Sequence, residues 1–376
     1  MPKEILKKRI DKGIKTEFDS VVFYTTMTLV FIGIVMVFSA SCIQATFKHD
    51  DPYHFLKRNI IFAVLGFIVM IITSKIDYRL WKKHAKAIGI VAVIFLVLVL
   101  TPLGIEANGA KRWLGIGSAS FQPSELAKFA TVIITAKLIE LRYDKIKSLT
   151  KGVLPLLIVP GIFFTLIILQ PNLSTAGTVI LVTFVMLFVA GMNMKIVIAM
   201  MCSGFGLFLA LVITSPYRLK RLLSFLDPFQ DPLGNGYQVI QGLYALGSGG
   251  LFGLGLGQSK QKYFYIPEPQ NDFIFAVIGE ELGLIGCIVV IMLFVLLVYR
   301  CIRIALKCED IFASMVVVGI GGQIGIQAAL NVAVATSSMP ATGVALPFIS
   351  YGGTSLVIFM AAIGIVLNIS KHVKIN

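Results

Sequence analysis

Residues 273–298 read FIFAVIGEELGLIGCIVVIMLFVLLV. This run exceeds the roughly 20 apolar residues that an α-helix needs to cross the hydrocarbon core of a bilayer. Glu280 and Glu281 are its only charged residues. The run therefore predicts a transmembrane helix, and a chain built largely of such runs would be an integral membrane protein.

The composition of the whole chain supports the same interpretation. Of its 376 residues, 57% are hydrophobic and 14% are charged, and the mean hydropathy is +0.89. Soluble globular proteins contain about 45–50% apolar and about 25% charged residues, so this chain has too few polar residues to cover a water-soluble surface. We predict an all-α polytopic membrane protein.

Further apolar runs divide the chain into spanning helices. The expected helices cover residues 20–42, 59–74, 86–101, 124–141, 153–170, 175–191, 194–214, 273–298, 311–335 and 354–369. The run 124–141 is the least apolar, because it carries Glu125, Lys128 and Lys137. Together the runs predict about ten transmembrane helices in a single membrane domain, residues 20–370, between tails at 1–19 and 371–376.

The distribution of positive charge predicts the orientation. The formal net charge is +14, and basic side chains gather in residues 1–19, 75–85, 142–152, 299–310 and 371–376. Cytoplasmic segments of membrane proteins carry an excess of Lys and Arg. Both termini are therefore predicted to be cytoplasmic, and an even number of helices keeps every basic segment inside. Charge in this arrangement indicates contacts with membrane lipids, and no nucleic-acid partner is expected.

This topology places the motif-like segments on the outer side. They read NGAKRWLGIGSASFQPSELAK at 108–128, QPNLSTAGT at 170–178, FYIPEPQNDFIFAVIGEELG at 264–283 and PATGVALPFISYGGTS at 340–355. The third lies at the end of a large outer loop, residues 215–272, between the seventh and eighth predicted helices. Pro and Gly also simply end helices, but loops held by a rigid scaffold often carry active sites. Because four segments share one face, we expect the functional site there.

Three acidic residues near this face are candidates for chemistry. Asp272 stands where the Pro-rich loop enters an apolar helix, a suitable place for a partly desolvated general base. A carboxylate that interacts favourably with the helix dipole would stand there as well. Glu280 and Glu281 lie roughly 12 Å deeper along the helix. Carboxylates inside a membrane are usually functional or paired, and both alternatives stay open for these two.

Cationic and aromatic side chains accompany these carboxylates. Lys111, Arg112 and Lys128 are suited to binding a diphosphate or a lipid headgroup, and Trp113 is suited to stacking on a sugar ring. Glu125 and Lys128 are three residues apart on one helix and can pair. Anchoring in the headgroup region is the alternative for Trp113. The Gly-rich stretch GSGGLFGLGLGQSK at 247–260 lacks the GK[ST] of a P-loop and favours close helix packing or a flexible loop.

Several of these segments resemble one protein family. NGAKRWLGIG with FQPSELAK, the loop ending IPEPQNDFIFAVIGEELG, and PATGVALPFISYGGTS are similar to the motifs of the SEDS family (shape, elongation, division and sporulation), which includes RodA, FtsW and SpoVE. The resemblance extends over roughly residues 20–370. Gln270 in the EPQ motif is most similar to the FtsW and SpoVE branch, which serves division and sporulation.

The resemblance implies a fold and an activity. It implies ten membrane helices with cytoplasmic termini, and polymerisation of lipid II into β-1,4-linked glycan strands at the outer face of the bacterial cytoplasmic membrane. Lipid II, the nascent glycan strand, a class B penicillin-binding protein and membrane lipids are the implied partners. Mg²⁺ is the implied cofactor, although the sequence contains no recognisable ligand set for it.

The resemblance also assigns residues. It implies that Asp272 is catalytic, as the base that deprotonates the acceptor sugar. The candidate substrate-binding residues are Lys111, Arg112, Trp113, Gln122, Ser124, Glu125, Lys128, Glu280 and Ser350. Asn172 and Asn271 depart from the family pattern. Asn172 replaces the Asp of QPDLGTA and removes one candidate acid or metal ligand, and Asn271 replaces a common Thr.

Two other functions use many of the same features. A flippase for the lipid-linked precursor would need similar helices and cationic groups, and Glu280 and Glu281 within the membrane favour it, because transporters bind their substrates near the midplane. A non-catalytic scaffold that recruits the transpeptidase would not need Asp272. The clustering of motifs at one face favours chemistry there.

Overall fold

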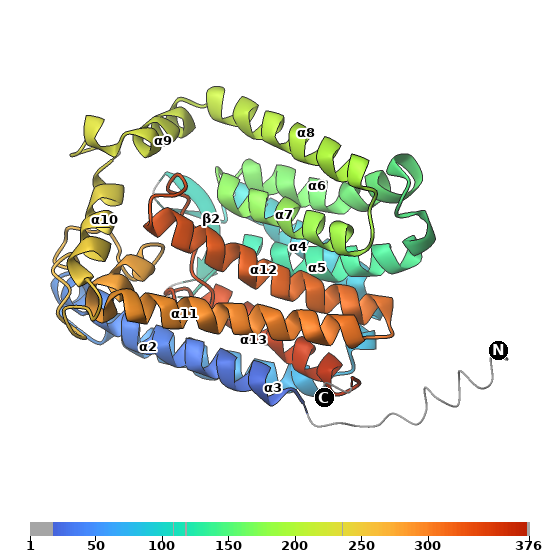
Figure 1. Cartoon of the computed structure of the whole chain (residues 1–376), viewed down its shortest axis with the longest axis horizontal. Coiled ribbons are helices and arrows are strands. Elements are labelled where there is room, and N and C mark those ends of the chain that lie inside the picture. The colour runs from blue at the N-terminus through green and yellow to red at the C-terminus, as the bar shows by residue number, and fades with distance from the viewer. Residues whose placement is uncertain (1–17, 108, 117–118, 235, 374–376) are drawn as a thin grey trace.

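The computed structural model describes residues 18–107, 109–116, 119–234 and 236–373. Each predicted apolar run coincides for most of its length with one long helix of a bundle (Figure 1). These helices are α2 (Ser20–His49), α3 (His54–Lys75), α4 (Tyr78–Leu100), α5 (Pro123–Leu141), α6 (Leu154–Ile168), α7 (Leu173–Val189), α8 (Met194–Ile213), α11 (Ile274–Lys307), α12 (Ile311–Ala335) and α13 (Gly353–Ser370).

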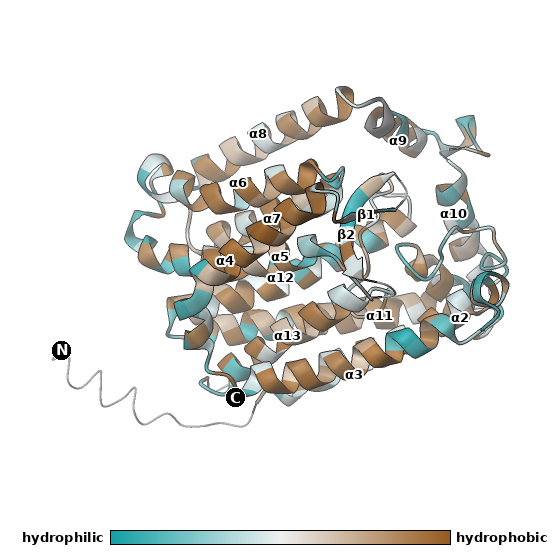
Figure 2. Ribbon diagram, turned by 180° about the vertical axis from the view of Figure 1, so that it is seen from behind, coloured by the Kyte–Doolittle hydropathy of each residue, from teal (hydrophilic) through white to brown (hydrophobic). Residues whose placement is uncertain are grey.

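The chain is a multi-pass membrane protein. Within the described residues, 8 helices are long and apolar enough to cross a bilayer. Of the ten long helices, α5 is set apart by its charged residues, which include Glu125 and Lys128, and α7 by its length of 17 residues. Helix α6 reaches 20 residues because the π-helical segment η2 (Leu149–Val153) directly precedes it. Hydrophobic residues line most of the long helices, and hydrophilic residues gather at their ends and in the loops (Figure 2).

The helix ends extend beyond several predicted runs. Asp77 accepts a hydrogen bond from the Arg79 amide and begins α4 eight residues before the expected position. At its other end, α11 continues through Arg300 and Arg303 to Lys307. Long basic side chains carry their charge back to the polar interface, so a helix can continue where its apolar run ends. The apolar runs therefore predicted where the helices lie better than where they end.

The expected all-α class is wrong in one segment. Between α4 and α5 the chain forms a three-stranded antiparallel sheet of β1 (Gly104–Ala107), β2 (Ala110–Ile116) and β3 (Ala119–Phe121). Trp113 pairs with Ile105, and Lys111 pairs with Glu106. β1 and β3 are too short for a period of two to be recognised, and β2 (AKRWLGI) has seven residues without a regular alternation of apolar and polar side chains.

The large loop contains two helices, α9 (Pro216–Leu226) and α10 (Tyr237–Gly249), with the short 3₁₀ turn η3 (Pro228–Gln230) between them. After α10 the chain passes through four glycines with positive φ and packs against α11, which is kinked at Gly283 (φ +68°). A Cβ at Gly253 would lie 2.1 Å from the Glu281 carbonyl oxygen. The Gly-rich stretch therefore allows close packing, one of the two predicted explanations.

The bundle has two distinct ends. At one end, the Asp19 amide donates to Ser370 Oγ (3.0 Å) and Arg300 forms an ion pair with the Asp19 carboxylate (2.6 Å). At the other end, Gln44 near the end of α2 donates to the Ile266 carbonyl oxygen (3.4 Å). We call this second end, where α2 and α12 finish and α5, α7, α11 and α13 begin, the loop end.

Candidate active site

The segment 340–355 joins the other three motif-like segments at the loop end. Three hydrogen bonds link them: Ser174 Oγ to the Thr342 carbonyl oxygen (2.7 Å), the Tyr351 amide to the Gln270 carbonyl oxygen (2.9 Å), and Thr354 Oγ1 to the Ser120 carbonyl oxygen (3.3 Å). The structure therefore brings together four segments that the sequence placed at one face. These segments, rather than the deeper helices, form the candidate site.

Asp272 lies just before α11, in the middle of these contacts. Its side chain is half-buried. Its carboxylate faces the 340–355 segment, because a Cβ built on Gly343 would lie 3.6 Å from Asp272 Oδ2. Gly343 has a φ of +64°, a conformation that favours glycine. The two segments can therefore approach closely enough for the carboxylate to lie against backbone.

Two side chains hold the backbone on either side of this carboxylate. Ser350 Oγ donates to the Asn271 carbonyl oxygen (2.6 Å) and accepts from the Leu346 amide (2.8 Å). The Ser350 hydroxyl thus links the 340–355 segment to the loop before α11. The sequence predicted a contact with substrate for Ser350, and the structure shows contacts with backbone. Asn331 donates to the carbonyl oxygen of Asp272 itself (2.8 Å). Sequence reasoning missed Asn331, although an amide inside an apolar run was a usable signal.

Glu125 and Lys128 form the predicted pair. Glu125 Oε1 and Lys128 Nζ are 2.7 Å apart, and the side chains are only 8% and 2% exposed. The second carboxylate oxygen, Glu125 Oε2, and the neighbouring Ser124 hydroxyl are buried and have no hydrogen-bond partner among the described residues. Buried polar atoms are rarely left unpaired in native proteins. The first turn of α5 therefore contains two polar atoms that the described residues leave unpaired.

The other substrate-binding residues predicted in the segment 108–128 lie on the three-stranded sheet or directly after it. Arg112 donates from Nε to the Gln170 carbonyl oxygen (3.2 Å) and from Nη2 to the Pro171 carbonyl oxygen. Lys111 is exposed, and Trp113 is half-buried. The Gln122 amide donates to Thr354 Oγ1 (3.4 Å).

The three predicted cations therefore have different surroundings. Arg112 fastens a turn and Lys128 is buried in an ion pair. Lys111 lines a cavity of about 250 Å³. The remaining lining residues of this cavity are Leu100, Glu106, Gly109, Ala110, Leu169, Gln170 and Pro171.

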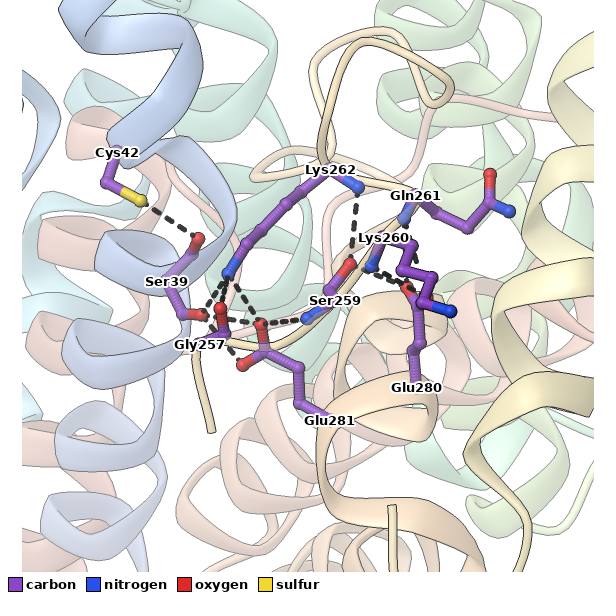
Figure 3. A network of polar contacts seen from close by, with 9 residues as sticks. All are labelled: Ser39, Cys42, Gly257, Ser259, Lys260, Gln261, Lys262, Glu280 and Glu281. Carbon is purple, nitrogen blue, oxygen red and sulfur yellow. Dashed lines mark hydrogen bonds and ion pairs between the residues drawn. The ribbon is translucent and has the colours of Figure 1, made fainter. Parts of the chain in front are cut away.

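Glu280 lies in a separate network (Figure 3). Its carboxylate accepts hydrogen bonds from Ser259 Oγ (2.5 Å) and from the amides of Lys260 (2.9 Å) and Gln261 (3.3 Å). Glu280 has 0% exposed surface. The predicted substrate-binding role of Glu280 has no support in this geometry, which matches the alternative of pairing inside the protein.

Glu281 completes the same network. Its carboxylate accepts from Ser39 Oγ on α2 (2.7 Å) and from the Ser259 amide (3.3 Å), and it pairs with Lys262 Nζ (3.0 Å). Lys262 Nζ also donates to the Gly257 carbonyl oxygen (2.6 Å). The network joins the large loop to α2 and α11. Among Asp272, Glu125, Glu280 and Glu281, only Asp272 is more than slightly exposed, so it is the carboxylate that a substrate can reach.

Comparison with known sequences identifies the family. The model of the FtsW/RodA/SpoVE family, described as cell cycle proteins, matches residues 19–375. The chain is 44% identical over 359 residues to stage V sporulation protein E of Bacillus subtilis, covering 95% of this chain and 98% of that protein. It is also 44% identical over 373 residues to the probable peptidoglycan glycosyltransferase FtsW of Trichlorobacter lovleyi, covering 99% and 97%.

Solved structures agree. A chain of a peptidoglycan synthase complex that coordinates polymerization and crosslinking superposes with a TM-score of 0.76 at 31% identity, covering 94% of this chain and 97% of that one. The Rod shape determining protein RodA of Thermus thermophilus superposes with a TM-score of 0.70 at 29% identity, covering 94% and 96%. The expected resemblance is thus confirmed over nearly the whole length, and the chain belongs to the FtsW/RodA/SpoVE family, known as SEDS proteins.

Proposed function

We propose that this protein is an inverting peptidoglycan glycosyltransferase that polymerises lipid II for division or sporulation. Similarity to probable peptidoglycan glycosyltransferases over nearly the whole chain supports this activity. The observation that carries the assignment is the position of Asp272, a half-buried carboxylate at the meeting point of the motif segments.

The chemistry follows from the linkages of substrate and product. Lipid II carries an α-linked sugar on undecaprenyl diphosphate, and the product is β-1,4-linked, so a single displacement accounts for the inversion. Asp272 accepts the proton of the acceptor 4-hydroxyl as that oxygen attacks the donor's anomeric carbon. The bond from this carbon to the diphosphate breaks, and the diphosphate leaves with the electron pair.

The leaving diphosphate requires positive charge. We assign this role to Lys111, which is exposed beside the cavity. We also assign it to Lys128 at the first turns of α5, which is buried in its pair with Glu125 and would meet the diphosphate once the substrate opens that pair. Arg112 supports the turn at 170–171. The described residues contain no group of three or more His, Cys, Asp or Glu side chains that could hold a metal ion. Mg²⁺ is bound in many enzymes through one or two carboxylates and the substrate's phosphates, so here it would be held mainly by the diphosphate of the substrate.

We propose that α5 and α7 also span the membrane, which gives ten spans in one membrane domain, residues 20–370. The Asp19–Ser370 hydrogen bond supports an even number of spans, because it holds the start of α2 and the end of α13 at the same end of the bundle. The basic segments 75–85 and 142–152 favour a cytoplasmic location for that end. The loop end, with Asp272 and the large loop 215–272, then faces outward from the cytoplasmic membrane.

A class B penicillin-binding protein is the partner that we propose. The similarity to a chain of a synthase complex that coordinates polymerization and crosslinking supports it. The flippase alternative depended on Glu280 and Glu281 near the midplane, and their oxygens are occupied by groups of the chain itself. No comparable observation favours the scaffold alternative.

Polymerisation of labelled lipid II by the purified protein tests the proposal. The protein is assayed alone and with its cognate class B partner, and the partner alone serves as the control. We expect glycan ladders that depend on this chain. If no ladder forms under either condition while the protein is folded, the glycosyltransferase assignment is wrong and a transport assay with the same lipid becomes the next test.

The Glu125–Lys128 pair gives a prediction that separates stability from catalysis. Lys128→Met leaves a buried carboxylate without its cation, and removing one partner of a buried pair costs about 3–5 kcal/mol. The double variant Glu125→Gln/Lys128→Met has no unpaired charge, so it should recover most of the thermal stability. It should remain at least about 10-fold slower in polymerisation, because the charge that meets the diphosphate is still missing. If the double variant polymerises lipid II at the wild-type rate, Lys128 does not contact the substrate.

A further inference from the structure

Asn331 makes two hydrogen bonds that join different segments of the site. It lies near the end of α12 with 1% of its surface exposed. Its Nδ2 donates to the carbonyl oxygen of Asp272 (2.8 Å) and to that of Val344 (2.8 Å). Both partners are acceptors, so only the nitrogen of the amide can face them. Both protons of the amide nitrogen are thereby used by backbone from two loops.

The other half of this amide has no evident structural use. Asn331 Oδ1 is buried and has no hydrogen-bond partner among the described residues. An apolar residue would avoid that unpaired oxygen in the interior of α12. The two carbonyl contacts are therefore the feature that accounts for an asparagine at this position.

The two loops joined by Asn331 are those that enclose the Asp272 carboxylate. Val344 follows Gly343, against which Asp272 Oδ2 lies. Ser350 holds the preceding carbonyl, that of Asn271. Carbonyls 271 and 272 are consequently both held, one from each side, and the backbone of Asp272 has little freedom to shift relative to the 340–355 segment.

Both loops that Asn331 joins contain a strained backbone conformation that has to be held in place. Glu268 (φ +46°) in one loop and Phe348 (φ +65°) in the other are non-glycine residues in the left-handed region. Such conformations persist when the surrounding structure determines them, and they gather at functional sites. Asn331 and Ser350 both tie these loops together and so help to hold the two conformations.

We propose that Asn331 is a positioning residue for Asp272, holding the catalytic carboxylate at its working distance by binding the two loops that flank it. The inference rests on the proposed function, because it assigns Asn331 a role in the step that Asp272 performs. A general base has to lie within hydrogen-bond reach of the proton that it accepts. A misplacement of about 1 Å can lower a rate about 100-fold.

Asn331→Leu tests the proposal, because leucine has a similar size and no donor. We expect kcat for lipid II polymerisation to fall about 100-fold, while KM stays within about twofold. Hydrogen–deuterium exchange should increase in peptides covering 266–272 and 342–351. Asn331→Ser retains one donor and should give an intermediate kcat, and this variant replaces the leucine variant if the latter does not fold.

Asn368→Leu is a matched structural control at the opposite end of the bundle. Asn368 is 5% exposed, accepts from the Tyr78 amide (3.0 Å) and donates to the Ser74 carbonyl oxygen (3.0 Å). Its loss should lower thermal stability without changing kcat per folded molecule or exchange at 266–272. If Asn368→Leu loses as much kcat as Asn331→Leu, the effect is general destabilisation and the positioning role is overturned.

Other outcomes separate this inference from the proposed function. Wild-type kcat in Asn331→Leu, alongside an inactive Asp272→Ala, would overturn the positioning role and leave the function intact. A wild-type protein that makes no glycan would instead contradict the proposed function. The exchange measurement still decides whether Asn331 holds the two loops, and unchanged exchange at both peptides would overturn that as well.

Discussion

Asp272→Asn should fold as the wild type does and form no visible glycan ladder from lipid II. The substitution keeps the size of the side chain and removes its ability to accept a proton at neutral pH. General-base catalysis contributes roughly 10²–10⁴-fold to a rate, so we expect a fall within that range, with substrate binding much less affected. The measurement is polymerisation of labelled lipid II by purified variants in the presence of the class B partner.

Glu268→Gln is the control for this substitution. Glu268 is an exposed carboxylate in the same loop, and its Oε2 accepts a hydrogen bond from Asn271 Nδ2 (2.7 Å). The amide oxygen of glutamine can accept the same bond, so polymerisation should stay within about threefold of wild type. Equal ladders from Asp272→Asn and Glu268→Gln would exclude Asp272 as the base. Glu125, which lies within the same motif segments, would then be tested next.

The sequence predicted the helices well because the bilayer imposes a simple rule on them. A backbone inside lipid must satisfy its own hydrogen bonds, so each long apolar run becomes a helix. The sheet at 104–121 was not predictable in this way, because it lies in a loop where water also satisfies the backbone. The extension of α11 to Lys307 was missed because the apolar run ends at 298, and the helix continues through basic residues whose long side chains reach the polar interface.

The candidate site was predictable in its location and much less in its contacts. Alternating helices bring every second loop to the same end of the bundle, so charge alone placed the motif segments together. The uses of individual side chains depend on long-range contacts with backbone. Ser350 bonds to a carbonyl 79 residues away and Arg112 to one 58 residues away. Sequence spacing contains no trace of such partners. Asn331 was recognisable as an amide inside an apolar run, but its two carbonyl partners were not.

The Glu280–Glu281 network gives the largest expected effect on stability. Among the described residues, Lys262 is the only cation whose side chain bonds to this network, and its side chain is 2% exposed. Lys262→Met would leave two fully buried carboxylates with hydrogen-bond donors but without a neutralising charge. Breaking a buried pair in this way costs about 3–5 kcal/mol. We expect a marked fall in the melting temperature of the detergent-solubilised protein, measured by thermal unfolding.

Lys260→Met provides a closely matched comparison, because the Lys260 amide donates to Glu280 while its side chain is exposed. Its stability should stay within about 0.5 kcal/mol of wild type. The double variant Glu281→Gln/Lys262→Met should recover part of the loss, since it removes one carboxylate together with the cation. If Lys262→Met has the same melting temperature as Lys260→Met, the ammonium group of Lys262 does not compensate the charge of the buried carboxylates.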